Sequence, residues 1–293
     1  MTRAALALAL AGSLAAGAAA APAPKRKDPF DAEARSWAAK GYVLKDRVET
    51  RAGGSPAAVA VYASEKGAGD RLEAYVVVDG KTYIAYLHPA EAERLELDVT
   101  PAGRGFLDLL GDGSRVVAYH ATVPALNATT LYVLRYRRPR FTLAGRFPEG
   151  RFVQIGRRVI VQSRDLPLGR FLTVGCAGFG TISQTAFRTR LYAPVDGRFV
   201  EVTRAYPKFF AAEILRKEAA LARLRPDLQK NAGEYLGLAL SVYYDYAAVG
   251  RAREGWEKQK EFFSLPPGAP RRVEACFAAM RRDLKERLRV PAR

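Results

Sequence analysis

Short apolar stretches rich in Val, Tyr, Phe and Thr recur along the chain from about residue 41 to residue 203. Turn residues separate them, a pattern typical of β-strands. Two Asp-Gly pairs, Asp79-Gly80 and Asp196-Gly197, are strong hairpin signals. Regular short strands without helices between them predict an antiparallel sandwich, barrel or propeller-like assembly. The expected strands are residues 58–63, 72–78, 82–86, 95–99, 115–122, 130–137, 141–146, 152–155, 159–162, 171–174, 187–192 and 199–202.

The pattern changes at Pro207, where apolar residues begin to recur every three or four positions, as on one face of a helix. A shorter helix is expected before the strands, because Asp28 can cap it and Pro29 suits a first turn. The expected helices are residues 29–39, 207–224, 232–248, 251–263 and 273–288.

The second and third of the expected C-terminal helices contain four tyrosines and a tryptophan: Tyr235, Tyr243, Tyr244, Tyr246 and Trp256. Aromatic residues at helical spacing either fill a core or present a face to a protein or a sugar. The sequence leaves both interpretations open.

These elements predict an α+β protein with an antiparallel β-rich region of propeller-blade-like or sandwich units, followed by a C-terminal helical region. Three similar units of about forty-five residues can be read at 58–99, 113–147 and 156–202. The predicted organisation is a signal peptide, a leader with a short helix, a β-rich domain and a helical region, at residues 1–20, 21–40, 41–205 and 206–293.

One turn carries a more specific pattern. Residues 108–113 read Asp-Leu-Leu-Gly-Asp-Gly and precede the strand expected at 115–121. The turn resembles the Asp-rich turn of FG-GAP or VCBS-type β-propeller repeats, with Asp108 and Asp112 at matching positions. Leu110 stands where that family often has an oxygen ligand. Calcium requires six to eight oxygens, so the turn is expected to keep its shape without a bound metal.

The N-terminus has the three parts of a secretory signal peptide. Arg3 is followed by an apolar stretch at residues 4–16 and by small residues at 17–21. Cleavage is expected after Ala20, because cleavage one residue later would leave Pro22 next to the scissile bond. No other long apolar run follows, so we expect no transmembrane segment in the mature chain and localisation in the periplasm or outside the cell.

The chain has two cysteines, Cys176 and Cys276. Export permits a disulfide between them, closing a loop of about a hundred residues whose constraint contributes on the order of 4–5 kcal/mol in the chain-entropy model. The alternative is two unpaired thiols packed as small apolar side chains.

The formal net charge is +17, and residues 100–207 contribute 16 arginines against 6 acids. A basic surface favours encounter with polyanions. One predicted strand and the turn after it alternate basic residues with an aromatic residue. These are the candidate binding residues: Arg135, Tyr136, Arg137, Arg138 and Arg140. The same alternation also fits a strand with one packed and one solvated face. A helix-turn-helix, a zinc finger and an RNP-like strand are all missing, which argues against nucleic acid as the partner.

No residue qualifies as catalytic. Residues 175–180 resemble the run around the catalytic cysteine of NlpC/P60 cell-wall peptidases, but those enzymes need a downstream histidine as base, and none follows His120. His88 and His120 lack carboxylates or cysteines at ligand spacing, so we expect no metal and no cofactor. No nucleophile-elbow, zincin or P-loop motif is present.

These observations predict an exported, non-enzymatic binding or envelope-associated protein with a basic surface. Its expected partner is an anionic envelope polymer or another protein. The alternative is an exported hydrolase that acts on a cell-envelope polymer with a pair of carboxylates about 5–10 Å apart.

Overall fold

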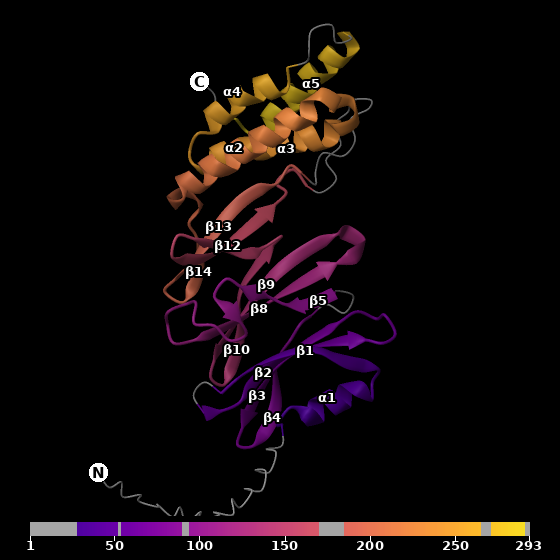
Figure 1. Ribbon diagram of the computed structural model, residues 1–293, viewed down its shortest axis with the longest axis vertical. Helices are drawn as coiled ribbons and strands as arrows, with labels where there is room; N and C mark the ends of the chain where they lie inside the picture. The colour runs from indigo at the N-terminus through magenta and orange to yellow at the C-terminus, as the bar shows by residue number, and fades with distance from the viewer. Residues whose placement is uncertain (1–27, 52–53, 90–93, 170–184, 265–270, 291–293) are drawn as a thin grey trace, which may run out of the picture.

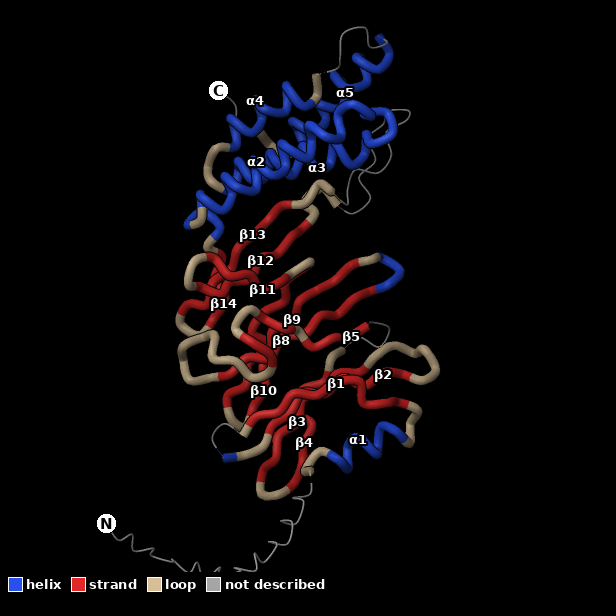
Figure 2. The backbone as a smooth tube through the Cα atoms, viewed as in Figure 1, coloured by secondary structure: helices blue, strands red, loops and turns tan. Residues whose placement is uncertain are grey.

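The computed structural model describes residues 28–51, 54–89, 94–169, 185–264 and 271–290. Three four-stranded antiparallel sheets follow one another along the chain, and a group of helices follows the last sheet (Figures 1 and 2). The predicted α+β class, with a β-rich part and a C-terminal helical part, is confirmed.

In each sheet the strands are hydrogen-bonded in the order in which they occur along the chain. Asp79-Gly80 and Asp196-Gly197 form the two predicted hairpin turns, and all four residues have positive φ, which suits the tight turn between twisted strands. The first sheet contains β1 (Tyr42–Thr50), β2 (Ala57–Ser64), β3 (Arg71–Val78) and β4 (Lys81–Leu87). The second contains β5 (Arg94–Leu97), β8 (Arg115–Val123), β9 (Ala128–Arg137) and β10 (Arg140–Pro148). The third contains β11 (Arg151–Ile155), β12 (Arg158–Asp165), β13 (Arg188–Val195) and β14 (Arg198–Glu201).

The predicted grouping of strands into units was wrong in two places, and one strand was not predicted. The strand predicted at 152–155 lay outside the unit at 156–202, but β11 pairs with β12 in the third sheet. The strand predicted at 95–99 was placed in the first unit, but β5 pairs with β8 in the second sheet. The first strand, β1, was not predicted, because its residues are mostly polar and only partly buried. A small ribbon of β6 (Val99–Thr100) and β7 (Gly103–Arg104) and a 3-10 turn, η2 (Pro124–Leu126), complete the second unit.

The three sheets pack face to face, so that apolar residues of each central strand serve two cores (Figure 1). Between the first and second sheets, Val59 and Leu72 pack in one cluster with Tyr119. On the other face of the second sheet, Val133 packs in a cluster with Val161 of the third sheet. Successive residues of a strand point to opposite faces, which explains why runs such as β2 are buried along most of their length.

Helices cover the two outward faces of this stack. α1 (Asp31–Ala38) places Phe30 and Trp37 on the outer face of the first sheet, in a cluster with Tyr62 and Tyr75. At the other end, Phe210 packs on the outer face of the third sheet. An array of repeated units requires capped ends to keep its terminal apolar faces from water. The helices therefore allow three sheets to form a stable stack without closing into a ring.

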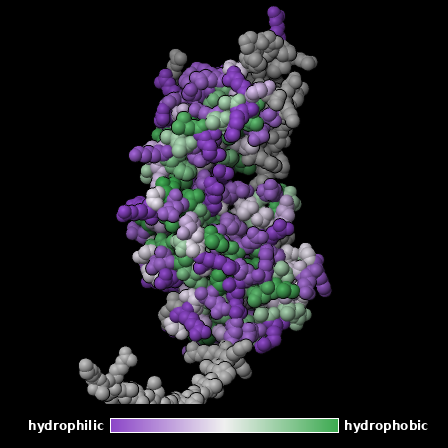
Figure 3. Space-filling view, viewed as in Figure 1, coloured by the Kyte–Doolittle hydropathy of each residue, from purple (hydrophilic) through white to green (hydrophobic). Residues whose placement is uncertain are grey.

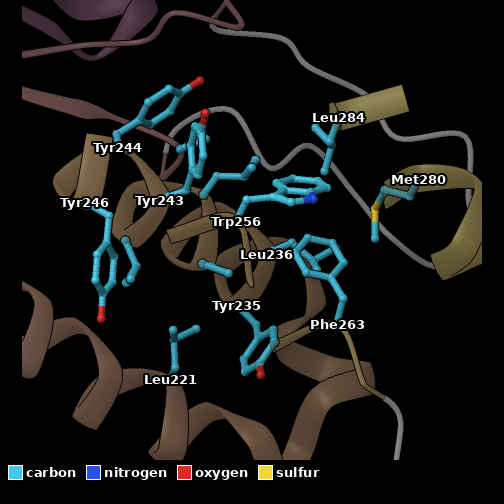
Figure 4. Packing of buried hydrophobic residues seen from close by; sticks show 14 of the residues in the cluster. Leu221, Tyr235, Leu236, Tyr243, Tyr244, Tyr246, Trp256, Phe263, Met280 and Leu284 are labelled. Atoms are coloured by element: carbon cyan, nitrogen blue, oxygen red, sulfur yellow. The ribbon is translucent and has the colours of Figure 1, made fainter. Parts of the chain in front are cut away.

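The C-terminal helices surround a core of their own (Figure 4). The four tyrosines and Trp256 of this region are all at least nine-tenths buried, so the interpretation as core residues is confirmed. Pro207 begins the first of these helices, as predicted. The elements are η3 (Thr203–Ala205), α2 (Pro207–Leu224), η4 (Arg225–Asp227), α3 (Leu228–Ala248), α4 (Ala252–Phe262) and α5 (Arg271–Arg287).

Several predictions concern parts of the chain outside the described residues. The signal peptide at 1–20, the strand at 171–174 and Cys176 all lie there, and of Cys276 only its place in α5 is described. The disulfide and export therefore stay predictions. Among the described residues, no helix combines the length and the apolar character that crossing a membrane requires.

Candidate anion-binding cleft

The Asp-rich turn at 108–113 is held by protein groups. The Asp112 carboxylate accepts hydrogen bonds from the backbone N–H of Ser114 at 3.1 Å, from the Ser114 hydroxyl and from Arg135. The Ser114 hydrogen bonds and the Arg135 charge lower the pKa of Asp112. Leu110 is 5% exposed and belongs to the core between the second and third sheets. Within the described ranges, no cluster of three or more His, Cys, Asp or Glu residues could hold a metal ion.

The predicted basic strand divides between three environments. Arg135 is engaged by Asp112 and Ser114. Tyr136 is buried, with its ring 4.9 Å from that of Phe141. The remaining members lie exposed at the turn between β9 and β10: Arg137, Arg138 and Arg140. The structure therefore brings three of the five predicted residues together on the surface.

A cleft opens where the third sheet meets α3. β14 pairs with β13 only from Tyr192 to Val195, so the beginning of β13 has no strand beyond it on that side. The space left has a volume of about 370 Å³, within the usual range of small-molecule sites. Its lining residues are Arg188, Thr189, Arg190, Glu201, Thr203, Arg204, Tyr243, Tyr244, Ala247, Ala248 and Leu288.

Two carboxylates hold the arginines of β13 in place. Asp165 on β12 lies opposite Arg188 and accepts two hydrogen bonds from its guanidinium, at 3.0 and 2.5 Å. Arg190 lies between Asp165 and Glu201, at 3.5 and 3.1 Å. The hydrogen bond to Asp165 raises the pKa of Arg188. Bidentate pairing of this kind fixes the plane of a guanidinium and leaves its outer N–H groups to bind another anion.

A third arginine gives the cleft an excess of positive charge. Arg204 is exposed at the rim, and no ion pair is found for it among the described residues. With Arg188 and Arg190 it makes three cations against the two carboxylates, Asp165 and Glu201. The cleft therefore favours a negatively charged occupant.

Two buried hydroxyls on the cleft wall have no hydrogen-bond partner among the described residues. Thr189 is 1% exposed and Tyr244 is 6% exposed, yet neither hydroxyl oxygen is paired. Leaving a buried hydroxyl unpaired costs about 1–3 kcal/mol. Burial raises the pKa of Tyr244, which keeps this hydroxyl protonated and able to donate. Both hydroxyls therefore belong to residues that line the cleft and retain hydrogen-bonding capacity that no described protein group uses.

A second polar cluster lies deeper, between α2, α3 and the third sheet. Lys217 Nζ lies 2.8 Å from Ser241 Oγ and 2.5 Å from Asp245 Oδ2. A lysine beside a serine has the chemistry of a nucleophile with its base. Both side chains of the ion pair are 0% exposed and Ser241 is fully buried, so no substrate can reach them. The cluster is a structural link between the helices and the sheet.

The histidines are also tied into the fold. His88 is buried and its Nδ1 lies 2.9 Å from the Tyr119 hydroxyl, in the core between the first two sheets. His120 Nε2 lies 3.2 Å from Asp98. The sequence missed that carboxylate because the pairing of β5 with β8, which places Glu96 opposite His120, brings Asp98 to the histidine.

The comparisons with known proteins add no relative: no protein-family model, curated protein or solved structure matches this chain. The cleft must therefore be interpreted from its own geometry. The sequence contained one signal for it, the Arg-Thr-Arg alternation at 188–190. It gave no sign that residues 243–248 of α3 would form the opposite wall.

Proposed function

We propose that this protein is a non-enzymatic binding protein that holds an anionic group of its ligand in the cleft between β13 and α3. The observation that carries this proposal is the presence, in one cleft, of three arginines and of two buried, unpartnered hydroxyls, Thr189 beside the arginines and Tyr244 on the α3 side. Arginine binds planar anions through several N–H groups at once. The signal peptide expected at residues 1–20 supports a site of action in the periplasm or outside the cell.

Removing the rim arginine, Arg204, is the direct test, with inorganic phosphate as the probe. If phosphate binds the unaltered protein, a concentration of ten times its Kd should stabilise the folded state by about 1.4 kcal/mol. We expect Arg204→Gln to weaken phosphate binding about tenfold or more, because a hydrogen bond to a charged group contributes about 1.5–3 kcal/mol. Isothermal titration calorimetry measures both Kd values. Arg223→Gln, at an exposed position on α2, is the matched control.

Two results would contradict the proposal. One is the absence of phosphate binding to the unaltered protein at millimolar concentration. The other is an equal loss of affinity in Arg204→Gln and Arg223→Gln, which would show that total charge and not the cleft attracts the anion.

The exposed arginines between β9 and β10 are a separate candidate contact for an anionic polymer. We expect the triple variant Arg137→Gln, Arg138→Gln and Arg140→Gln to elute from a heparin column at lower salt than the unaltered protein, because salt screens exposed charges. The control replaces three exposed arginines on three helices, Arg223, Arg253 and Arg282. Equal shifts in the two triple variants would show a dispersed basic surface with no local site.

The alternative function, a hydrolase, would use the two carboxylates at the cleft. Asp165 and Glu201 both contact Arg190, and Asp165 also binds Arg188. Glu201 accepts a further hydrogen bond from Thr203 at 3.0 Å. These contacts make the carboxylates the groups that orient the arginines, which supports binding over hydrolysis.

A further inference from the structure

The two walls of the cleft differ in chemistry. One wall, formed by β13, β14 and η3, carries the arginines and the threonines, together with Glu201. The opposite wall carries side chains of α3 and Leu288, which directly follows the end of α5. An anionic group placed against the arginines keeps polar partners, whereas Ala247, Ala248 and Leu288 offer apolar contact to the rest of a ligand.

The α3 wall has a regular shape. Tyr243 and Ala247 are four residues apart, as are Tyr244 and Ala248, so the four form two adjacent rows on one helix face. The tyrosine rings lie 5.6 Å apart, edge to face, and are only 4% and 6% exposed, so they form a firm and mostly covered part of this wall. One helical turn further along, the small side chains of Ala247 and Ala248 leave room beside the tyrosines. Figure 4 shows both tyrosine hydroxyls on the side of α3 away from Tyr235 and Leu221.

The size of the cleft also exceeds what an inorganic anion needs. About 370 Å³ is available, whereas one water molecule takes about 30 Å³ of liquid volume. Small-molecule sites commonly combine an apolar surface with a few polar groups that fix the orientation of the ligand. The arginine wall would supply the orientation and the α3 wall would supply contact area.

We propose, on the basis of the anion-binding function above, that the ligand is an amphiphilic anion, with a carboxylate or phosphate joined to a small apolar or aromatic body. The anionic head binds Arg188, Arg190 and Arg204, and the body lies along the tyrosine and alanine rows of α3 against Leu288. Tyr244 and Thr189 donate to the head from the junction of the two walls.

Matched pairs of small probes test this. We expect phenyl phosphate to bind at least tenfold more tightly than inorganic phosphate, and benzoate at least tenfold more tightly than acetate, in calorimetric titrations. The difference between the two pairs identifies the preferred head group. Benzyl alcohol, which has the aromatic body without the charge, should bind more weakly than either aromatic anion.

Variants on the α3 wall separate the two parts of the site. Ala247→Leu fills the space beside Tyr243, and Leu288→Ser removes apolar contact. We expect each to weaken phenyl phosphate at least fivefold and to change inorganic phosphate less than twofold. Leu215→Ser, at a 68% exposed leucine on α2, is the control.

The outcomes distinguish this inference from the function it rests on. Equal affinities for phosphate and phenyl phosphate, both reduced by Arg204→Gln, would overturn the inference that the ligand is amphiphilic. They would leave the proposed anion site in place. Failure of every anion to bind would overturn both. Binding of benzyl alcohol as tight as that of benzoate would show an apolar pocket and would also overturn the inference.

Discussion

Replacement of Lys217 by methionine is expected to lower the free energy of unfolding by about 3–5 kcal/mol at pH 7. This is the usual cost of leaving the remaining member of a buried ion pair without its partner. Lys217 and Asp245 are both 0% exposed. Without the lysine, Asp245 keeps no cation within hydrogen-bond distance among the described residues, and its Oδ1 is already unpartnered. Urea unfolding followed by circular dichroism measures the change.

The pH dependence of this loss has a definite sign. Burial raises the pKa of Asp245 to about 6, even with Lys217 beside it, and burial lowers the pKa of Lys217. Removing the lysine raises the pKa of Asp245 further. A folded pKa above the unfolded one means that the native state binds the extra proton, so this contribution to stability is present below about pH 4 and is lost as pH rises through the folded pKa. The deficit of Lys217→Met should therefore be smaller at pH 5 than at pH 8.

A double variant provides the control for packing. Lys217→Met combined with Asp245→Val removes both charges, and replacing a buried ion pair with apolar residues is often neutral or stabilising. We expect the double variant to be more stable than Lys217→Met alone and to lose the pH dependence. A deficit in Lys217→Met below about 1 kcal/mol and constant between pH 5 and pH 8 would show that water reaches the pair.

Replacement of Trp37 by alanine is expected to cost about 3–5 kcal/mol, as for other large aromatic residues in a core. Trp37 is 9% exposed, and its ring lies 5.3 Å from Tyr42 and 6.0 Å from Tyr62. Its indole N–H donates to Glu73 at 2.9 Å, and Glu73 is 1% exposed. The variant therefore loses apolar contact and one of the hydrogen bonds of a buried carboxylate.

The same variant tests whether α1 caps the stack. If α1 loosens, the outer face of the first sheet becomes an exposed apolar surface, and such surfaces promote association. Size-exclusion chromatography should then show concentration-dependent oligomers. Trp37→Phe retains an aromatic ring and should cost about 1–3 kcal/mol for the lost hydrogen bond, with no oligomers. Ser36→Ala, on the exposed face of α1, is the neutral control, and a loss in Trp37→Ala equal to that of Ser36→Ala would refute the capping role.

The surface itself gives few clues to function. On the face shown in Figure 3, hydrophilic and hydrophobic residues are interspersed over the sheets and the helices. Exposed apolar side chains such as Tyr83, Ile84 and Leu143 lie on the outermost strands β4 and β10. Strand edges that carry charged residues and bulges resist pairing with other chains. β10 has both, with Arg140 and Arg146 exposed and a register shift between Leu143 and Gly145.

Local residue patterns were enough to predict most of the secondary structure. The Asp-Gly hairpins and the helix that begins at Pro207 were predicted from the sequence and are present. Period-two and period-3.6 patterns report which face of an element is buried, but for the tyrosines of α3 they left a core and a binding face both open, and only the packing showed a core. β1 was not predicted, because its residues are only partly buried and mostly polar.

The sequence by itself determined the class of the protein, the order of its elements and the excess of arginine from which an anionic partner was predicted. Tertiary structure decided which strands share a sheet, as with β5, and which arginines are available. Arg135 is neutralised by Asp112, whereas Arg204 stands exposed at the cleft. The reason is physical: hydrophobic periodicity is a property of each segment, but the cleft depends on where β14 stops and which face of α3 lies opposite β13. Contacts between residues more than fifty positions apart, such as the hydrogen bond from the Ser241 hydroxyl to the Phe187 carbonyl, are made only when the segments pack.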